Sequence, residues 1–272
     1  MQLVASPAGP IEVHDWGAGD RAIVLLHAAA SHPQALGRLA ERLAVHGFRV
    51  FAPALAGYGD TFAASKADPI GAHVAVARAV LATVGTQRAV LFGHSMGGLV
   101  ALRTALAEPT VTSVFAYEPV AFGVLDRVRE PDAAAAAWDR RIADQLVAAV
   151  ESGDAEHGVA AFFEAWSQVR WEILTEMRRR SLVASADRLA AEVACVSRDQ
   201  TPASTYAPLG PRLTLLRGSH SPVAARLIAG RIASAAAGST LIDVAGASHM
   251  TPAMEPDAIA NTIVSKLEPD AP

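Results

Sequence analysis

The sequence predicts an α/β protein with a mostly parallel sheet, helices on both faces and an inserted helical region. Short apolar runs alternate with segments of helical periodicity at both ends of the chain, which is the pattern of a parallel sheet covered by helices. Between about residues 120 and 206 the alternation stops, and helical patterns follow one another with almost no strand signal. The 272 residues, 51% of them hydrophobic, are enough for one large core with an insertion. We therefore predict a core of 1–119 and 207–272 and an insertion of 120–206.

The first half of the chain begins with a hairpin and continues as alternating strands and helices. Continuous apolar runs are typical of strands buried on both faces. Helical stretches that stop at a glycine indicate helix C-termini. The expected strands are 3–6, 11–16, 22–26, 49–52, 88–92 and 111–117, and the expected helices are 34–45, 70–84 and one that ends near residue 107.

The second half contains the insertion and then a return to alternation. Its patterns predict insertion helices over 132–150, 159–180 and 185–196, then strands over 213–216 and 240–244 with helices over 223–236 and 256–267. The three arginines of 178–180 lie within a helical pattern, and we interpret them as a solvated helix face.

A Gly-His-Ser-Met-Gly motif spans Gly93 to Gly97. It follows an apolar strand and precedes a helix-forming run, so it fits the G-x-S-x-G nucleophile elbow, in which a strained strand-to-helix turn exposes the serine hydroxyl. The glycines suit a turn where backbone segments approach closely, since a Cβ would clash there. The alternative is an ordinary glycine-rich turn, but the strand–turn–helix context favours the elbow. We predict Ser95 as a nucleophile.

A serine hydroxyl needs a nearby base, and the base needs an orienting acid. In chains with this elbow the acid and the histidine follow the serine. Of the nine histidines, five precede the motif, and His94 adjoins the serine and should point away from it. His157 lies in the insertion, which leaves His220 and His249. His249 follows the last strand, at the carboxyl end where open α/β sheets place their sites, so we predict His249 as the base.

Together these motifs resemble the α/β-hydrolase fold superfamily, in its serine-nucleophile branch with a helical cap, over essentially the whole chain. The matching stretches are the elbow, His27 after the third strand, Gly57-Tyr58-Gly59 after the fourth, and Gly246 to Met250 before the last helix. The resemblance implies Ser95 as nucleophile and His249 as general base. It also implies an oxyanion hole formed by the backbone amides of Met96 and Ala29.

One departure from the family pattern lies in the loop after strand 22–26. Relatives carry His-Gly there, whereas this chain has His27-Ala28. The oxyanion donor is a backbone amide, so the hole can survive the change, but alanine restricts the turn more than glycine does.

The acid is a second departure. Many relatives carry an aspartate after the penultimate strand, and Ser221 stands at the matching position. A serine cannot hold the negative charge that the base requires. Some relatives supply the acid from the end of the strand that follows the elbow helix, which here is Glu118. We predict Glu118 as the acid, because a carboxylate there fits both chain order and position, and we regard Asp199 and Asp126 as weaker candidates.

Composition and the absence of certain motifs argue against several other classes of function. A net charge of −4 and a pI near 6.1 give no basic surface for nucleic acid. The single cysteine, Cys195, excludes an internal disulfide, fits a reducing compartment and is expected to be a small buried hydrophobic residue. No signal peptide or membrane-spanning run is evident, so we expect a cytoplasmic protein with no membrane partner. No dinucleotide, Walker or zinc motif is present, and we expect neither cofactor nor metal.

The function predicted from these residues is that of a serine hydrolase for a small-molecule ester, lactone or thioester, acting through an acyl-enzyme on Ser95. C–C bond hydrolysis and perhydrolysis would use the same triad. A ligand-binding protein of this fold with little catalysis is the alternative from a different class. Trp138, Trp166 and Trp171 are expected to pack the insertion onto the core, where it would form the substrate pocket. A homodimer is left open.

Overall fold

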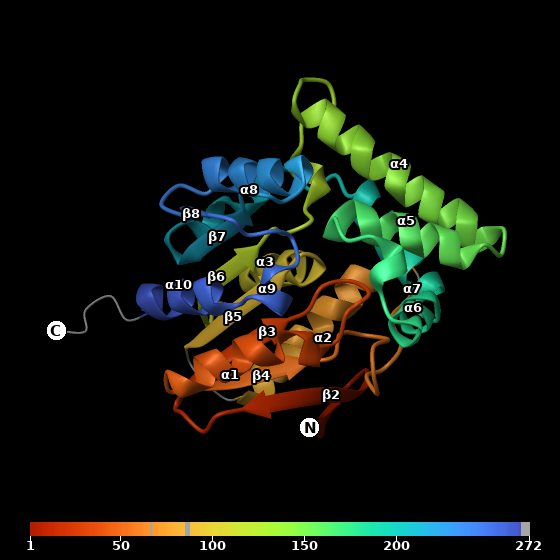
Figure 1. Ribbon diagram of the computed structural model, residues 1–272. Helices are drawn as coiled ribbons and strands as arrows, with labels where there is room; N and C mark the ends of the chain where they lie inside the picture. The colour runs from red at the N-terminus through yellow and green to blue at the C-terminus, as the bar shows by residue number, and fades with distance from the viewer. Residues whose placement is uncertain (66, 85–87, 268–272) are drawn as a thin grey trace.

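The computed structural model describes residues 1–65, 67–84 and 88–267. Within them lies one eight-stranded sheet, formed by β1 (Gln2–Ser6), β2 (Gly9–Trp16), β3 (Arg21–Leu26), β4 (Phe48–Pro53), β5 (Ala89–His94), β6 (Val111–Tyr117), β7 (Leu213–Gly218) and β8 (Thr240–Val244). The strand order is β1-β2-β4-β3-β5-β6-β7-β8. Strands β3 to β8 are parallel, and β2 pairs antiparallel with both β1 and β4. The carboxyl ends of β5, β6 and β8 therefore meet at one edge of the sheet (Figure 1).

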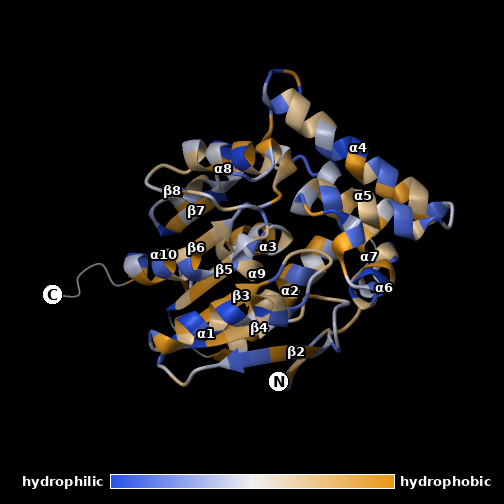
Figure 2. Ribbon diagram, viewed as in Figure 1, coloured by the Kyte–Doolittle hydropathy of each residue, from blue (hydrophilic) through white to orange (hydrophobic). Residues whose placement is uncertain are grey.

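Helices cover both faces of this sheet. The core helices are η1 (Pro33–Leu36), α1 (Gly37–Val45), α2 (Pro69–Val84), α3 (Met96–Ala107), η4 (Ala203–Arg212), α8 (Val223–Ala235), α9 (Thr251–Met254) and α10 (Asp257–Leu267). One apolar cluster joins the sheet to α1 and α10, and a second joins it to α2, α3 and α8. The sheet is thus the middle of three layers, and Figure 2 shows the hydrophobic colour running along its central strands.

The central strands are buried because their sequences are apolar without interruption. Every residue of β5 is buried, and in β3 the five residues after Arg21 are too. Parallel strands covered by helices on both faces require such runs, since neither face meets water. This is why the predicted strands match the observed ones to within one or two residues at most ends.

Six helical segments precede η4 in the chain between β6 and β7. They are η2 (Phe122–Val124), α4 (Asp132–Glu151), α5 (Ala155–Ser167), η3 (Trp171–Ile173), α6 (Glu176–Val183) and α7 (Ala186–Arg198). We call residues 120–206 the helical block. Figure 1 shows α4 to α7 together on one side of the molecule, beyond the edge of the sheet. The block has its own apolar cluster, which includes Leu146, Leu182 and Leu189.

The single helix predicted over 159–180 is wrong. The chain leaves the helix at Gln168, which adopts a left-handed conformation with φ 58°, and it resumes as η3 and α6. Glu164 accepts a hydrogen bond from the Trp171 amide at 2.6 Å, and the Thr175 hydroxyl caps α6 by accepting from the Arg178 amide. Helical periodicity continues through the break in the sequence. The pattern therefore does not reveal these hydrogen bonds from side chains to backbone amides, which replace those of a continuous helix.

Aromatic side chains connect the helical block to the core. The Trp166 ring lies 5.3 Å from that of Trp138 and 6.1 Å from that of Phe122, both in edge-on contact. Trp166 and Phe122 belong to the apolar cluster of the core. Cys195, expected to be a small buried hydrophobic residue, is half-buried and packs against the core cluster. In the described part of the chain, none of the helices is both long and apolar enough to cross a bilayer.

Candidate active site

Ser95 occupies the sharp turn between β5 and α3. Its backbone lies at φ 57° and ψ −115°, a strained conformation for a residue with a side chain. A Cβ on Gly93 would lie 2.1 Å from the Gly97 carbonyl oxygen, and one on Gly97 would lie 2.1 Å from that of Leu26. The two glycines are therefore required by the close approach of backbone segments, as the sequence motif predicts.

Neighbouring backbone holds this turn in place. The Ser95 amide donates to the Tyr117 carbonyl at 2.9 Å, and the Ser95 carbonyl accepts from the Val120 amide at 3.4 Å. Such bonds on both sides of the residue stabilise a conformation that an isolated chain would avoid. The serine is 7% exposed and lines a cavity between the sheet edge and the helical block.

Glu118 and His249 meet beside this cavity, although 131 residues separate them in the chain. The Nδ1–H of His249 donates to Oε2 of Glu118 at 2.7 Å. Glu118 directly follows β6, and His249 lies in the loop after β8. The parallel sheet brings both to the edge that carries Ser95.

Glu118 is fully buried, so its charge must be balanced within the protein. Its second carboxylate oxygen accepts from the Gly218 amide at 2.6 Å, and its own amide donates to Leu216 at 3.0 Å. Its backbone φ of 48° lies in the left-handed region. Because Nδ1 of His249 carries the proton, Nε2 is the nitrogen left to act as an acceptor.

The other acid candidates lie elsewhere. Asp199 pairs with Arg103 at 3.0 Å, and exposed Asp126 accepts from the amides of Val128 and Arg129. Ser221 is buried next to Gly218, at the end of β7. None of the three makes a hydrogen bond to His249 in the part of the chain that the structure describes.

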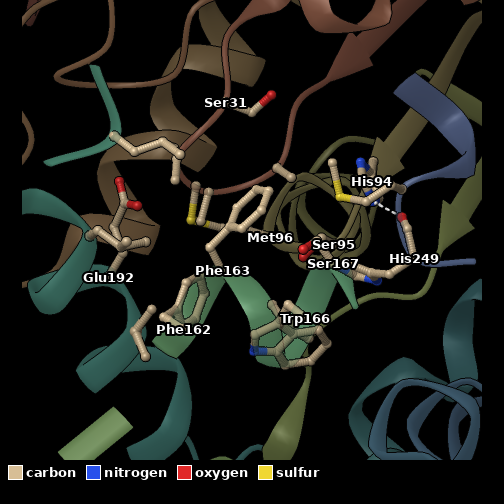
Figure 3. Close-up of a pocket in the computed structure, with 18 of the residues that line it drawn as sticks. Ser31, His94, Ser95, Met96, Phe162, Phe163, Trp166, Ser167, Glu192 and His249 are labelled. Carbon is tan, nitrogen blue, oxygen red and sulfur yellow. Dashed lines mark hydrogen bonds between the residues drawn. The ribbon is translucent and has the colours of Figure 1, made fainter. Parts of the chain in front are cut away.

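His94 lies closer to the site than its sequence position indicated. We expected its side chain to point away from the serine, yet it lines the cavity, with its ring 5.0 Å from that of His249. Its Nε2–H donates to the His249 carbonyl at 2.7 Å (Figure 3). Burial and the neighbouring His249 hold the pKa of His94 well below its usual range, so the neutral His94 ring helps to hold the His249 backbone in place. No local sequence signal distinguishes this contact.

Met96 and Ala29 both line the cavity. Met96 is the first residue of α3, where amides have no acceptor within the helix, and Ala29 donates to no acceptor within the described residues. The preceding His27 is fully buried, and burial lowers its pKa to about 3. Neutral His27 donates from Nδ1 to the Ala28 carbonyl at 2.8 Å and accepts from the Leu55 amide at 3.1 Å, which anchors the start of the loop.

The rest of the cavity wall comes largely from apolar side chains of the helical block. Phe162, Phe163 and Trp166 of α5 line it, and the Trp166 ring lies 4.9 Å from that of His249 (Figure 3). A lining of this kind is typical of small-molecule sites.

Three charged side chains of the helical block also line the cavity, and sequence reasoning predicted none of them: Asp139, Arg178 and Glu192. Burial raises the pKa of Asp139 to about 6. Arg178 and Arg179 are both half-buried, so within the arginine run the prediction of a solvated face holds only for the exposed Arg180. Among the described residues, no three histidine, cysteine or carboxylate side chains are grouped so as to hold a metal ion.

Residues 23–262 match the profile described as the alpha/beta hydrolase family. The chain belongs to this family. A 2-hydroxy-6-oxononadienedioate/2-hydroxy-6-oxononatrienedioate hydrolase from a Pseudomonas species is 32% identical over 106 residues, which cover 37% of each chain. The match thus spans little more than a third of that relative's length.

Solved structures superpose on this α/β hydrolase over nearly all of its length. The enol-lactonase from Burkholderia xenovorans LB400 superposes with a TM-score of 0.72 at 20% identity, covering 98% of this chain and 99% of that one. The 2-hydroxy-6-oxo-6-phenylhexa-2,4-dienoate hydrolase from Rhodococcus sp. strain RHA1 gives a TM-score of 0.71 at 20% identity, with coverage of 98% and 97%. At these identities the likeness establishes the fold.

Proposed function

We propose that the protein is a serine hydrolase of a small ester or lactone, with Ser95 as nucleophile, His249 as base and Glu118 as acid. The observation that carries the proposal is the buried hydrogen bond between Glu118 and His249 at 2.7 Å, beside a cavity that Ser95 also lines. A buried carboxylate that fixes one nitrogen of a histidine leaves the other free to accept a proton.

In the proposed reaction, Ser95 Oγ attacks the substrate carbonyl carbon while Nε2 of His249 takes the hydroxyl proton. The carbonyl oxygen becomes an oxyanion facing the amides of Met96 and Ala29. The tetrahedral intermediate collapses, the C–O bond to the leaving group breaks, and His249 gives its proton to the departing oxygen. Water then attacks the acyl-enzyme by the same steps and releases the acid. In the described structure Ser95 makes no hydrogen bond to His249, and catalytic contacts of this kind often tighten only when substrate binds.

The proposal is tested with a fluorophosphonate probe and p-nitrophenyl esters of increasing acyl length. We expect stoichiometric labelling, with the adduct on the peptide containing Ser95, and a burst of nitrophenol when deacylation is slower than acylation. We expect short acyl chains to be preferred, because the phenyl and indole rings of α5 form part of the cavity wall. Absence of both labelling and turnover would favour a ligand-binding protein of this fold.

The position of Arg178 favours a substrate that has a carboxylate group at a distance from the bond to be cleaved. It lines the otherwise mostly apolar cavity, and no carboxylate of the described residues lies within ion-pair distance of it. Burial lowers the pKa of its guanidinium, so a bound anion would offset its desolvation. The name of the Pseudomonas relative describes a dioate substrate.

We expect Arg178→Gln to raise KM about tenfold for the mono-p-nitrophenyl ester of a dicarboxylic acid, which corresponds to about 1.4 kcal/mol. KM for the neutral butyrate ester should stay within about twofold, since that substrate has no charge to recognise. Steady-state kinetics on the two esters provide the measurement. Arg180→Gln is the matched control, because Arg180 pairs with Glu176 on the surface. An equal rise in KM for both esters would contradict a carboxylate contact.

C–C bond hydrolysis is a second candidate, favoured by the names of the Pseudomonas relative and the Rhodococcus structure. The same residues would serve it, with the bond to a carbon leaving group broken in place of an ester bond. Turnover of a dienoate ketone, followed by the loss of its visible absorbance, would distinguish this activity from ester hydrolysis.

A further inference from the structure

The loop of residues 28–30, which we call the oxyanion loop, contains a strained alanine. Ala30 has φ 53°, a left-handed conformation that residues with a Cβ seldom adopt. The sequence predicted a restricted backbone at Ala28, whereas the residue with the strained backbone is Ala30. Strain of this kind persists only where neighbouring groups hold it, so the groups that hold Ala30 also restrain the preceding residue, Ala29.

Those groups are Tyr58 and, behind it, Glu192 of α7. The Ala30 amide donates to the Tyr58 hydroxyl oxygen at 3.1 Å, and the Tyr58 O–H donates to Oε2 of Glu192 at 2.7 Å. The tyrosine is 4% exposed and the glutamate is fully buried. A chain of hydrogen bonds that ends on a carboxylate is stronger than its separate members, because each bond polarises the next.

Further contacts fix both members of this chain. The other carboxylate oxygen of Glu192 accepts from Nε2 of His73 at 3.1 Å. The Arg188 guanidinium stacks 3.7 Å from the centre of the Tyr58 ring and donates to the Gly57 carbonyl. Burial and the adjacent Glu192 raise the pKa of Tyr58 well above its usual range, so the hydroxyl remains a donor to the carboxylate.

The same loop touches the helical block at two other points. The Ala30 carbonyl accepts from Arg178 of α6 at 3.5 Å, and Ala29 and Ala30 pack against the apolar cluster of the block. Figure 3 places Glu192 across the drawn cavity from His249, on the side away from the proposed triad. Although Glu192 lines the cavity, both of its carboxylate oxygens are engaged, one by the Tyr58 hydroxyl and the other by Nε2 of His73.

We propose that Glu192 is a positioning residue that orients the oxyanion loop through Tyr58. The oxyanion hole therefore depends on the packing of the helical block against the core. Glu192 belongs to the block while Tyr58 and Ala30 belong to the core, so the chain of bonds is complete only when the two are in contact. The proposal rests on the proposed function for its catalytic consequence. Its structural part, the fixation of the Ala30 amide, stands independently.

The test compares Tyr58→Phe and Glu192→Gln with the wild type in the full-length protein. The phenylalanine keeps the ring and removes the acceptor for the Ala30 amide, and the glutamine keeps the shape and removes the charge. We expect Tyr58→Phe to lower kcat by about tenfold to a hundredfold, less than the ~100–1,000-fold cost of losing an oxyanion donor outright. KM should stay within about twofold. Glu192→Gln should lie between Tyr58→Phe and the wild type.

Two further readouts separate positioning from general damage. Binding of a trifluoromethyl ketone, whose adduct carries the oxyanion, should weaken in parallel with kcat, whereas binding of the product acid should not. Hydrogen–deuterium exchange should accelerate at residues 28–31 in both variants. Tyr206→Phe is the matched control, because Tyr206 is equally buried but makes no hydrogen bond to the oxyanion loop.

Unchanged exchange at residues 28–31 in Tyr58→Phe would overturn the proposal. So would a fall in kcat that Tyr206→Phe reproduces, or one accompanied by an equal rise in KM. If the wild-type protein has no turnover, the proposed function fails, and the exchange measurement alone still decides whether Tyr58 and Glu192 hold the loop.

Discussion

Ser95→Ala is expected to lower kcat by about 10⁶, the cost of removing the nucleophile from a serine–histidine pair. The elbow holds the Ser95 backbone at φ 57°, and alanine can occupy the same conformation, so the fold should be unaffected. KM should change little, because the serine contributes little to ground-state binding. Turnover of a p-nitrophenyl ester and labelling by a fluorophosphonate measure the effect.

Ser167→Ala is the matched control for this variant. Ser167 also lines the cavity and is 5% exposed, but it ends α5 and has no elbow or paired histidine beside it. It should retain labelling and most of its turnover. The double variant Ser95→Ala/His249→Ala should be no slower than Ser95→Ala alone, because the two residues act as a unit. Labelling that survives in Ser95→Ala would show that the nucleophile lies elsewhere.

Glu118→Gln is expected to lower kcat by about 10³–10⁴ with little change in KM. The glutamine oxygen would accept from the Gly218 amide, which leaves its NH₂ group facing Nδ1 of His249. That nitrogen must then become an acceptor, and the proton moves to Nε2, where it prevents the histidine from acting as a base. The substitution is isosteric, so the loss would come from the tautomer and not from the packing.

Circular dichroism and the unfolding midpoint of Glu118→Gln should stay close to those of the wild type, which separates catalysis from folding. Glu172→Gln, a change at an exposed glutamate, should have no kinetic effect. A Glu118→Gln enzyme that keeps more than about a tenth of the wild-type kcat would mean that another group orients His249. Ser221→Asp in the Glu118→Gln background would then show whether a carboxylate at the position used by relatives restores the rate.

Most of the core could be predicted from the sequence because its strands and helices are specified locally. The short apolar runs of β3 and β5 are typical of strands buried on both faces, and Gly47 marks the end of the helical pattern close to the end of α1. The helix ends within the insertion were harder to predict. Gln168 and Thr175 interrupt what reads as one helix, through side-chain and backbone contacts that periodicity does not register.

The sequence by itself determined where the elbow lies and which residues compete for the roles of base and acid. Gly93, Ser95 and Gly97 form a short contiguous signal, since the turn they make is a local structure. His249 was predicted from chain order and its place after the last strand, and Glu118 from the position at which some relatives of this fold carry the acid. The structure places the two side chains 2.7 Å apart.

Only the tertiary structure decided which other side chains reach the cavity. His94, Arg178 and Glu192 meet the site through contacts with residues 155, 148 and 134 positions away in the chain, respectively. No periodicity or motif encodes such contacts, because they depend on how the helical block packs against the strand ends. The strained Ala30 shows the same limit: its conformation is imposed by Tyr58 and Glu192, not by its own preferences.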